Sequence, residues 1–369
     1  MTTLTAAQAR AFLVSFHGLA RPMGHGHEGV RAWLGRIGCI QIDPLDRIGT
    51  NADLVAMARI DGLKRNDVYD ALLPGFAFEH FAKERCLLPA GWFPWWRAHT
   101  VETPWWRLAE RHQKLDPDLV AAVLAEVRLR GPLRPTDLGD RGRVEAMDWH
   151  GWKGTGKAAT LALEVLWTRG DVVVCRRTGT SRWHDVPERA LPQIGAGGPQ
   201  GAFMDFALVA AVQAAGLLGW PGGQAVWSVL KGQRAVGEAA VARGAVEAVR
   251  IEGSAREWLA PAGFRDQPWD EPDDRMRILP PLDTLLWDRN LVRLVFGMDY
   301  VWEIYKPARQ RRFGWYTMPL LFRGQLVGRL EASYQGGEVR VEGLWAEDGV
   351  VVDAVALRTA LERHAEGLS

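Results

Sequence analysis

An internal repeat constrains the fold of this chain more than any other feature of its sequence. Residues 163–189, LEVLWTRGDVVVCRRTGTSRWHDVPER, and residues 238–264, EAAVARGAVEAVRIEGSAREWLAPAGF, follow one pattern. In each, a helix ends at an Arg-Gly pair, because glycine commonly follows the last helical turn. Two alternating segments around a glycine-containing turn then predict a β-hairpin, with a tryptophan on its second strand. The repeat predicts one supersecondary unit, helices followed by a hairpin, used more than once.

Helical segments precede both hairpins, and the N-terminal part of the chain follows the same plan. We expect helices near 116–140 and 155–169 before the first hairpin, and near 203–219, 222–231 and 234–243 before the second. The N-terminal part predicts helices near 5–18, 27–38, 51–60 and 66–73, a short strand at 39–43 and an extended stretch over 75–89. Three helices followed by a two-stranded hairpin form a winged helix, a relative of the helix-turn-helix. We therefore predict three winged-helix units, at residues 1–115, 116–195 and 196–265.

The pattern changes after Pro261. Residues 261–276 are rich in Pro and Asp and predict a linker. Beyond them, β-type segments dominate, at residues 301–307, 314–322, 325–334 and 338–346, and an amphipathic helix is expected over 351–367. Arg323-Gly324 predicts a tight turn between the second and third strands. The fold class is therefore α+β, with about three tandem winged-helix units followed by a small β-rich domain at 275–369.

Composition describes an ordinary globular chain and excludes several classes of protein. The 369 residues carry a net charge of +1, which neither demands nor excludes a nucleic-acid partner. No apolar run is long enough to span a bilayer, and the N-terminus lacks the pattern of a secretory signal. Three widely spaced cysteines, Cys39, Cys86 and Cys175, indicate a reducing compartment. We expect a cytoplasmic, nucleoid-associated monomer without a membrane anchor.

No metal site or cofactor is expected either. His25 and His27 share a glycine-rich loop, but no third ligand accompanies them, and a flexible loop is the simpler interpretation. The chain lacks the Cys/His spacings of zinc sites. A tryptophan cluster indicates a seam between two domains; its members are Trp92, Trp95, Trp96, Trp105 and Trp106.

The stretch IGCIQIDPLD contains a candidate catalytic pair. In an extended segment Gln41 and Asp43 point the same way and lie roughly 6.5–7 Å apart. A carboxylate beside a carboxamide can hold one water molecule, the acid accepting its proton and the amide orienting it. Pro44 then ends the strand. The alternative is structural: Asp before Pro is common in turns, and a glutamine on the wet face of a strand needs no special role.

Basic residues supply candidate DNA contacts. The densest run, KPARQRR, contains Lys306, Arg309, Arg311 and Arg312, which we interpret as phosphate contacts rather than as an ordinary solvated loop. Arg323, at its turn, and the hairpin arginines Arg176, Arg177 and Arg182 could enter a groove or follow the DNA backbone; the alternative is that they only decorate polar turns. Asp288 and Arg289 lie among Trp and Leu and indicate a structural ion pair or a buried network.

A long C-terminal run carries a family resemblance. Residues 279–332, LPPLDTLLWDRNLVRLVFGMDYVWEIYKPARQRRFGWYTMPLLFRGQLVGRLEA, strongly resemble the C-terminal signature of the bacterial YcaQ/AlkZ DNA glycosylases. The matching pieces are the block of Pro281, Asp283, Trp287, Asp288 and Arg289, the F-G-x-D-Y block at 296–300, and MPLLFRGQLVGR at 318–329. GCIQIDPLD is a second patch, and the similarity extends thinly over the whole chain.

The resemblance implies stacked winged-helix units, a β-rich C-terminal domain and excision of N-alkylated purines from double-stranded DNA, including purines in interstrand crosslinks. It makes Gln41 and Asp43 catalytic, in the Gln-x-Asp branch of the family, and places the chain in base excision repair of alkylation damage. The side chains suit this chemistry. A purine alkylated at N7 is a cationic leaving group, so Asp43 has to stabilise an oxocarbenium-like sugar and act as general base, while Gln41 orients the water.

Two departures from the family pattern affect the expected DNA contacts. The family pattern has Arg and aromatic or His residues after the catalytic motif, whereas residues 47–60 here are RIGTNADLVAMARI. It has W-A-H-E in the first hairpin, where this chain has Phe81-Ala82-Lys83-Glu84. Asn51 and Lys83 are the DNA-contact candidates in these two stretches.

Two alternatives stay open at this point. A non-catalytic winged-helix regulator would bind undamaged duplex, usually as a symmetric dimer, although no dimerisation segment is evident. A glycosylase that protects against one genotoxic natural product would have the same residues as a general repair enzyme.

Overall fold

The computed structural model describes residues 1–100, 113–145, 155–194, 198–220, 223–266 and 268–369. The chain forms two compact units. Unit 1 contains residues 1–68, 82–86 and 204–369, and unit 2 contains residues 69–81 and 87–203. Trp105 and Trp106 of the tryptophan cluster lie outside the described residues. Among the described residues, no helix combines the length and apolar character needed to span a bilayer.

The N-terminal elements follow the predicted order. They are α1 (Ala6–Phe16), α2 (Gly26–Ile37), β2 (Ile40–Gln41), α3 (Asn51–Met57), α4 (Asp67–Leu72), β3 (Ala77–Phe81) and β4 (Arg85–Pro89). Thr5 and Gln8 form a capping box that starts α1, and Thr50 and Asp53 form one that starts α3. Gly38 ends α2 with a φ of 70°, a left-handed conformation that glycine adopts without strain.

One prediction for this region was wrong in length. The strand expected over 39–43 ends at Gln41, so Asp43 lies beyond it. The physical reason is local: the Asp43 carboxylate accepts a hydrogen bond from the Leu45 N–H at 2.9 Å and so closes a turn around Pro44.

The second half of unit 1 begins with the later repeat. Its elements are α10 (Phe203–Ala215), β9 (Leu218–Trp220), η4 (Ser228–Leu230), α11 (Arg234–Ala242), β10 (Val246–Ile251) and β11 (Glu257–Pro261). The predicted hairpin is confirmed, with Val249 opposite Trp258, and Gly244 follows α11 with a φ of 72°. The N-terminal β1 (Thr2–Leu4) adds to β10 in parallel. The helix expected over 222–231 was wrong: within its described residues only the short 3₁₀ turn η4 forms.

Unit 2 contains the earlier repeat. Its elements include η1 (Ala90–Trp92), α5 (Phe93–Thr100), α7 (Pro117–Arg130), η3 (Pro135–Leu138), β5 (Arg143–Glu145), β6 (Thr155–Lys157), α8 (Ala158–Thr168), β7 (Val173–Thr178), β8 (Ser181–Asp185) and α9 (Pro187–Ala190). The β7–β8 hairpin is confirmed. The helix expected over 116–140 stops at Arg130, because Pro132 cannot continue a helix, and Leu133 instead forms a bridge to His184 of β8.

The same strand order recurs in these sheets. In the later repeat the order is β9-β11-β10, so the strand that lies between the helices pairs with the last strand of the hairpin. The bridge from Leu133 to β8 repeats this arrangement beside β7. The N-terminal strands have the order β2-β4-β3. The repeat seen in the sequence is thus also a repeat of topology.

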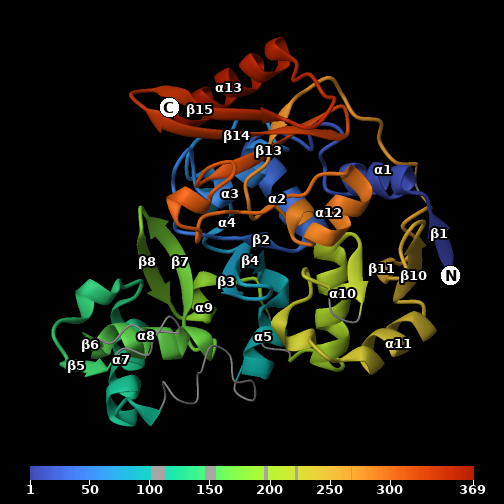
Figure 1. The fold of residues 1–369 in the computed structure, drawn as a ribbon. Helices are drawn as coiled ribbons and strands as arrows, with labels where there is room; N and C mark the ends of the chain where they lie inside the picture. The colour runs from blue at the N-terminus through green and yellow to red at the C-terminus, as the bar shows by residue number, and fades with distance from the viewer. Residues whose placement is uncertain (101–112, 146–154, 195–197, 221–222, 267) are drawn as a thin grey trace. The chain divides into compact units, whose positions relative to one another are not determined.

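The C-terminal part of unit 1 is an antiparallel sheet with a covering helix. Its strands are β12 (Arg277–Ile278), β13 (Thr317–Phe322), β14 (Gln325–Gln335) and β15 (Glu338–Ala346), in that order. Helix α13 (Ala354–Leu368) runs along this sheet (Figure 1). The turn at Arg323-Gly324 is confirmed, with φ values of 48° and 74°.

Two features of this part were not predicted. Residues 289–296 form α12, which Gly297 ends with a φ of 74°. Residues 301–307 were expected as a strand but form a loop, followed by the 3₁₀ turn η6 (Ala308–Gln310). The loop replaces the strand because Glu303 turns inward and binds backbone amides further along the chain.

A buried ion pair joins the N-terminal helices of unit 1 to its C-terminal part. Arg59 donates to both carboxylate oxygens of Asp283, at 2.7 and 2.8 Å, and neither side chain is exposed. The same guanidinium donates to the carbonyl oxygens of His17 and Val55, and it lies 5.0 Å from the Trp33 ring. Asp283 also accepts from the Leu285 N–H. Every charge-bearing atom of the pair is therefore hydrogen-bonded, as a buried pair requires.

Removing one partner of this pair should destabilise unit 1 strongly. We expect Asp283→Ala to lower the free energy of unfolding by about 3–5 kcal/mol, because it leaves the Arg59 charge buried and unpaired. Asp299→Ala is the matched control, since its partner Arg293 is exposed and such pairs contribute less than about 1 kcal/mol. Urea unfolding followed by fluorescence measures both, and equal losses would contradict the assignment.

Candidate active site

Gln41 lies at the end of β2 with its side chain buried and only 7% exposed. Its backbone carbonyl accepts a 2.7 Å hydrogen bond from the Asn51 side-chain amide, and the next amide, of Ile42, donates to the Arg85 carbonyl at 2.9 Å. In the part of the chain that the structure describes, neither Gln41 Oε1 nor Asn51 Oδ1 has a hydrogen-bond donor. Buried acceptors without donors are unusual in a protein interior, and these two could receive donors from a water molecule or a substrate.

Asp43 is half-buried just beyond the strand. Its Oδ1 accepts from the Leu45 N–H at 2.9 Å. Burial raises the pKa of the carboxyl, and the Leu45 hydrogen bond only partly opposes this shift. A raised pKa makes the carboxylate a stronger proton acceptor, as a general base requires. The turn interpretation of Asp43 is therefore correct for one of its oxygens and leaves the other for chemistry.

Tyr316 is a neighbour of Asp43 that the sequence did not single out. Burial raises the pKa of its phenol, and the negative charges of Asp43 and Asp46 raise it further, so the phenol stays protonated. Its ring meets Trp302 edge-on, with the ring centroids 6.1 Å apart. Trp302 packs in turn on the core cluster that contains Ile48 and Leu54. Residues 302 and 316 thus hold the base of the loop between them beside the Asp43 segment.

This loop carries the predicted basic run. Lys306, Arg309 and Arg312 are exposed, and Arg311 is partly exposed. Lys306 donates to the buried carboxylate of Glu303 at 2.7 Å, so its charge is largely neutralised. Arg311 donates to the Lys306 carbonyl at 2.8 Å. Among the described residues, no carboxylate forms an ion pair with Arg309.

The remaining candidates of unit 1 have mixed surroundings. Lys83 donates to the Gln224 carbonyl at 2.8 Å and lies 5.9 Å from the Trp287 ring. Burial lowers its pKa, and the nearby charges of Lys231 and Arg289 act in the same direction. Arg323 is exposed and pairs with Asp274 at 2.6 Å. Both cations are accessible in part and remain candidate DNA contacts.

Two predicted DNA contacts are poorly placed for that role. Asn51 is 1% exposed, and its amide supports the Gln41 backbone. Arg177, in unit 2, forms a bidentate pair with the buried Glu79 carboxylate and lies over the Tyr69 ring. Its charge is satisfied inside the unit, which indicates a structural role. Arg176 is exposed and stacks 4.0 Å from the centre of the Trp183 ring. Arg182 lies 3.6 Å from Glu164.

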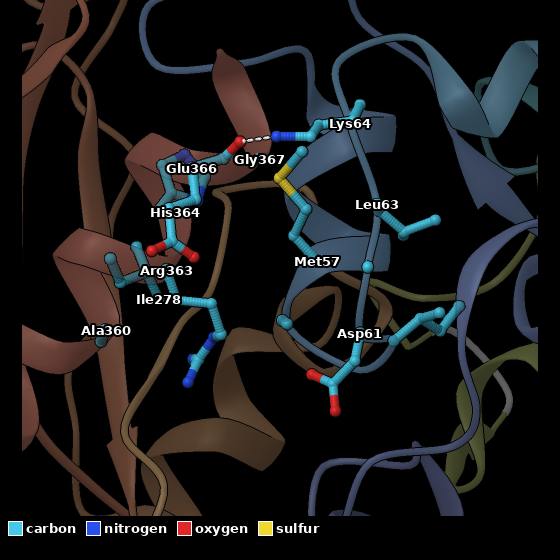
Figure 2. Close-up of a pocket in the computed structure, with 13 residues that line it drawn as sticks. Met57, Asp61, Leu63, Lys64, Ile278, Ala360, Arg363, His364, Glu366 and Gly367 are labelled. Carbon is cyan, nitrogen blue, oxygen red and sulfur yellow. Dashed lines mark hydrogen bonds between the residues drawn. The ribbon is translucent and has the colours of Figure 1, made fainter.

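A separate pocket of about 160 Å³ lies between the segment after α3 and helix α13 (Figure 2). Three of its polar side chains already have protein partners: Lys64 donates to the Glu366 carbonyl, His364 Nε2 donates to the Ile48 carbonyl at 2.6 Å, and Arg363 donates to the Met276 carbonyl. Burial, and then the charges of Arg275 and Arg277, lower the pKa of Arg363 to about 10. The pocket is therefore a structural junction and a weaker candidate site than the Gln41 region.

No cluster of three or more His, Cys, Asp or Glu side chains suited to a metal ion occurs among the described residues. His27 lies 3.5 Å from Asp67. The expected ion pair between Asp288 and Arg289 was wrong: Asp288 caps α12 by accepting from the amides of Asn290 and Leu291, and the cation near its carboxylate is Arg256, at 3.8 Å.

Comparison with known proteins gives two matches. A family model described as DNA glycosylase AlkZ-like matches residues 34–369. Among solved structures, the chain is similar to Streptomyces sahachiroi DNA glycosylase AlkZ, with a TM-score of 0.56 and 16% sequence identity over 100% of this chain and 97% of that one. At this identity the structural likeness shows a shared fold, of mixed α and β type.

The raised pKa of Asp43 has a consequence for stability. The folded chain binds this proton more tightly than the unfolded chain, whose carboxyl has the ordinary value of 3.8, so ionised Asp43 lowers the free energy of unfolding above that pH. We expect Asp43→Asn to be more stable than wild type at pH 7. The difference should shrink as the pH falls and vanish below the ordinary value. Urea unfolding at pH 7, 5 and 3 measures it.

Asp299→Asn is the control of opposite sign. The hydrogen bond from Arg293 lowers the pKa of Asp299, so this substitution should lower stability at pH 7 and lose its effect in acid. An Asp43→Asn variant less stable than wild type at pH 7 would refute the assigned environment.

Proposed function

Because the chain belongs to the AlkZ-like DNA glycosylase family, we propose that it excises N-alkylated purines, of the N7 type, from double-stranded DNA. Membership makes it a hydrolase of N-glycosyl bonds and sets aside the alternative of a non-catalytic regulator. The observation that carries the proposal is the Gln41 region, where unpaired buried acceptors lie two residues from a carboxylate of raised pKa.

Asp43 performs the main chemical work in this proposal. An N7-alkylated purine is a cation and leaves as a neutral base, so the bond breaks without a strong general acid. The carboxylate stabilises the positive charge that develops on the sugar and then accepts a proton from the attacking water. Its raised pKa favours the second role.

Gln41 holds the water. Its Oε1 has no donor among the described residues, so a water molecule can donate one proton there and the other to Asp43. Asn51 fixes the position of Gln41 by bonding to its backbone at 2.7 Å, and its own Oδ1 offers a further acceptor. We assign Asn51 as a positioning residue in place of a DNA contact.

We further propose that the fold contains three winged-helix units, at residues 1–115, 116–195 and 196–265, and a β-rich domain at 275–369. The recurring strand order, in which the strand between the helices pairs with the last strand of the hairpin, supports this division. In this arrangement Arg176, which is exposed on β7, is available to a phosphate, whereas Arg177 is paired with Glu79.

The proposed phosphate contacts in unit 1 are Lys83, Arg323 and the cations of the basic loop, which are Lys306, Arg309, Arg311 and Arg312. Their exposure, complete or partial, and the position of the loop next to Tyr316 support this role. We also propose that crosslinked purines are substrates and that the enzyme acts as a cytoplasmic, nucleoid-associated monomer. Assays on a panel of lesions separate general repair from resistance to one genotoxin.

The first test removes the Asp43 charge. We expect Asp43→Asn to slow release of free 7-methylguanine from duplex DNA by about 10²–10⁴-fold, the usual contribution of a general base, with DNA affinity unchanged. Asp46→Asn is the matched control, because Asp46 is engaged with the Gly49 amide and Arg65 and has no assigned role in the reaction. Base release by chromatography and affinity by fluorescence anisotropy measure the outcome. Unchanged turnover would remove the role of Asp43.

The second test separates function from stability at Gln41. Gln41→Met keeps the length of the side chain and removes an unpaired buried acceptor, so we expect stability to stay within about 1 kcal/mol of wild type or to rise. Base release should fall by at least about tenfold, because the water loses its second partner. Thermal unfolding and single-turnover rates on one preparation measure both. A variant that is unstable yet active would contradict the proposal.

A further inference from the structure

The loop between α12 and β13 is held in one conformation by a buried carboxylate. Glu303 is 2% exposed, and it accepts from the Lys306 ammonium at 2.7 Å and from the backbone amides of Arg312 and Phe313 at 2.8 and 2.9 Å. Burial opposes the ionisation of Glu303, but these hydrogen bonds outweigh it, and the pKa is lowered. The carboxylate therefore closes residues 303–313 into a ring that is preformed before any ligand binds.

A second carboxylate fixes the exit of this loop. Glu331 of β14 accepts from the amides of Trp315 and Tyr316, at 2.7 and 3.1 Å. The approach requires glycine at 314, which has a φ of +128°, and a Cβ there would lie 2.1 Å from Glu331 Oε2. Because Tyr316 is the residue that faces the charge of Asp43, the same support fixes the loop relative to the candidate catalytic carboxylate.

The loop presents one aromatic ring to solvent. Tyr305 is 83% exposed, and its aromatic contact among the described residues is an edge-on one with Trp302, at 6.3 Å. Lys306 follows it directly, and the guanidinium groups of Arg309 and Arg312 are exposed on the same short ring. An exposed aromatic side chain among cations on a rigid support has the composition of a nucleic-acid stacking site, where the ring meets a base and the cations meet phosphates.

We propose that Tyr305 stacks on a base at the damaged step of the duplex, while Arg309 and Arg312 contact the flanking phosphates. The inference rests on the proposed function and adds the residue that recognises the damaged site. Base pairs at a lesion are already weakened, so inserting a ring there costs less than at an intact step. Glu303 and Glu331 make the insertion efficient, because the ring loses little conformational freedom on binding.

The test uses a duplex that the enzyme is unable to hydrolyse. A tetrahydrofuran abasic analogue has no glycosidic bond to a base, and a neighbouring 2-aminopurine reports stacking through its fluorescence. We expect wild-type protein to change this fluorescence and to prefer the analogue duplex over an intact one. Tyr305→Ala should lose the fluorescence change and bind the analogue duplex about tenfold more weakly, within the range measured for base–aromatic stacking. Tyr305→Phe should retain both.

Arg309→Gln is the matched control with a different signature. It should keep the fluorescence change and lower the slope of log affinity against log salt by about one, because it removes one phosphate contact. Wild-type fluorescence and lesion preference in Tyr305→Ala would overturn the proposal. Loss of both in Tyr305→Phe would also overturn it, since the ring is then not the recognised feature.

The stacking measurement on the analogue duplex does not require base release, so the stacking inference and the proposed reaction can fail separately. Failure of wild-type protein to release 7-methylguanine, together with a Tyr305-dependent signal on the analogue duplex, would refute the proposed reaction and leave the stacking inference intact. Normal base release by Tyr305→Ala with an unchanged signal would refute only the inference.

Discussion

The ion pair between Arg59 and Asp283 is the interaction on which the rest of unit 1 depends. One guanidinium reaches the end of α1, the end of α3 and the start of the C-terminal part, through the His17 carbonyl, the Val55 carbonyl and the Asp283 carboxylate. Burying two charges is costly, and a hydrophobic pair of similar volume could stabilise the fold as well. What the ion pair adds is a fixed orientation of the joined segments, because a guanidinium binds a carboxylate through two hydrogen bonds in one geometry.

That geometry matters because the candidate site is built from segments far apart in the chain. Gln41, Asp43 and Asn51 come from the N-terminal part, at the end of β2, in the turn after it and at the start of α3, whereas Tyr316 and the basic loop come from the C-terminal part, some 270 residues later. Neither set is complete alone. The site itself lowers stability, through unpaired buried oxygens and a half-buried carboxylate. Other parts of the fold have to offset this loss, and in unit 1 the Arg59 network and the core clusters around Phe12 and around Leu330 do so.

The sequence predicted what local rules decide. Both repeat hairpins, the capped first helix, strand β15 and the final helix followed from alternation, glycine stops and capping. It failed where a side chain competes with the backbone. Asp43 accepts a hydrogen bond from the Leu45 amide, and its strand ends early. Glu303 accepts hydrogen bonds from three donors, so the alternating segment around it forms a loop and not a strand. A buried acid within an apolar stretch looks like an ordinary strand residue in a sequence, because its partners lie up to ten residues away or on another element. The candidate pair, Gln41 and Asp43, could be proposed from sequence because its two members are adjacent in one motif. The unpaired oxygens and Tyr316 could not, because they depend on contacts between distant segments.

Charge neutralisation explains why the basic residues differ in what they can do. Arg177, Lys306 and Arg323 each pair with a carboxylate, whereas Arg309 lacks an ion-pair partner among the described residues. With a net charge of +1, the whole chain gains little long-range attraction to DNA, so affinity for intact duplex depends on the few cations without a local partner. Weak attraction to intact DNA suits an enzyme that must find rare damage, because the many undamaged sites compete with the damaged one for binding the enzyme. In the proposed function, discrimination then depends on short-range groups, namely the exposed Tyr305 ring on a rigid loop and the acceptors at Gln41 and Asn51.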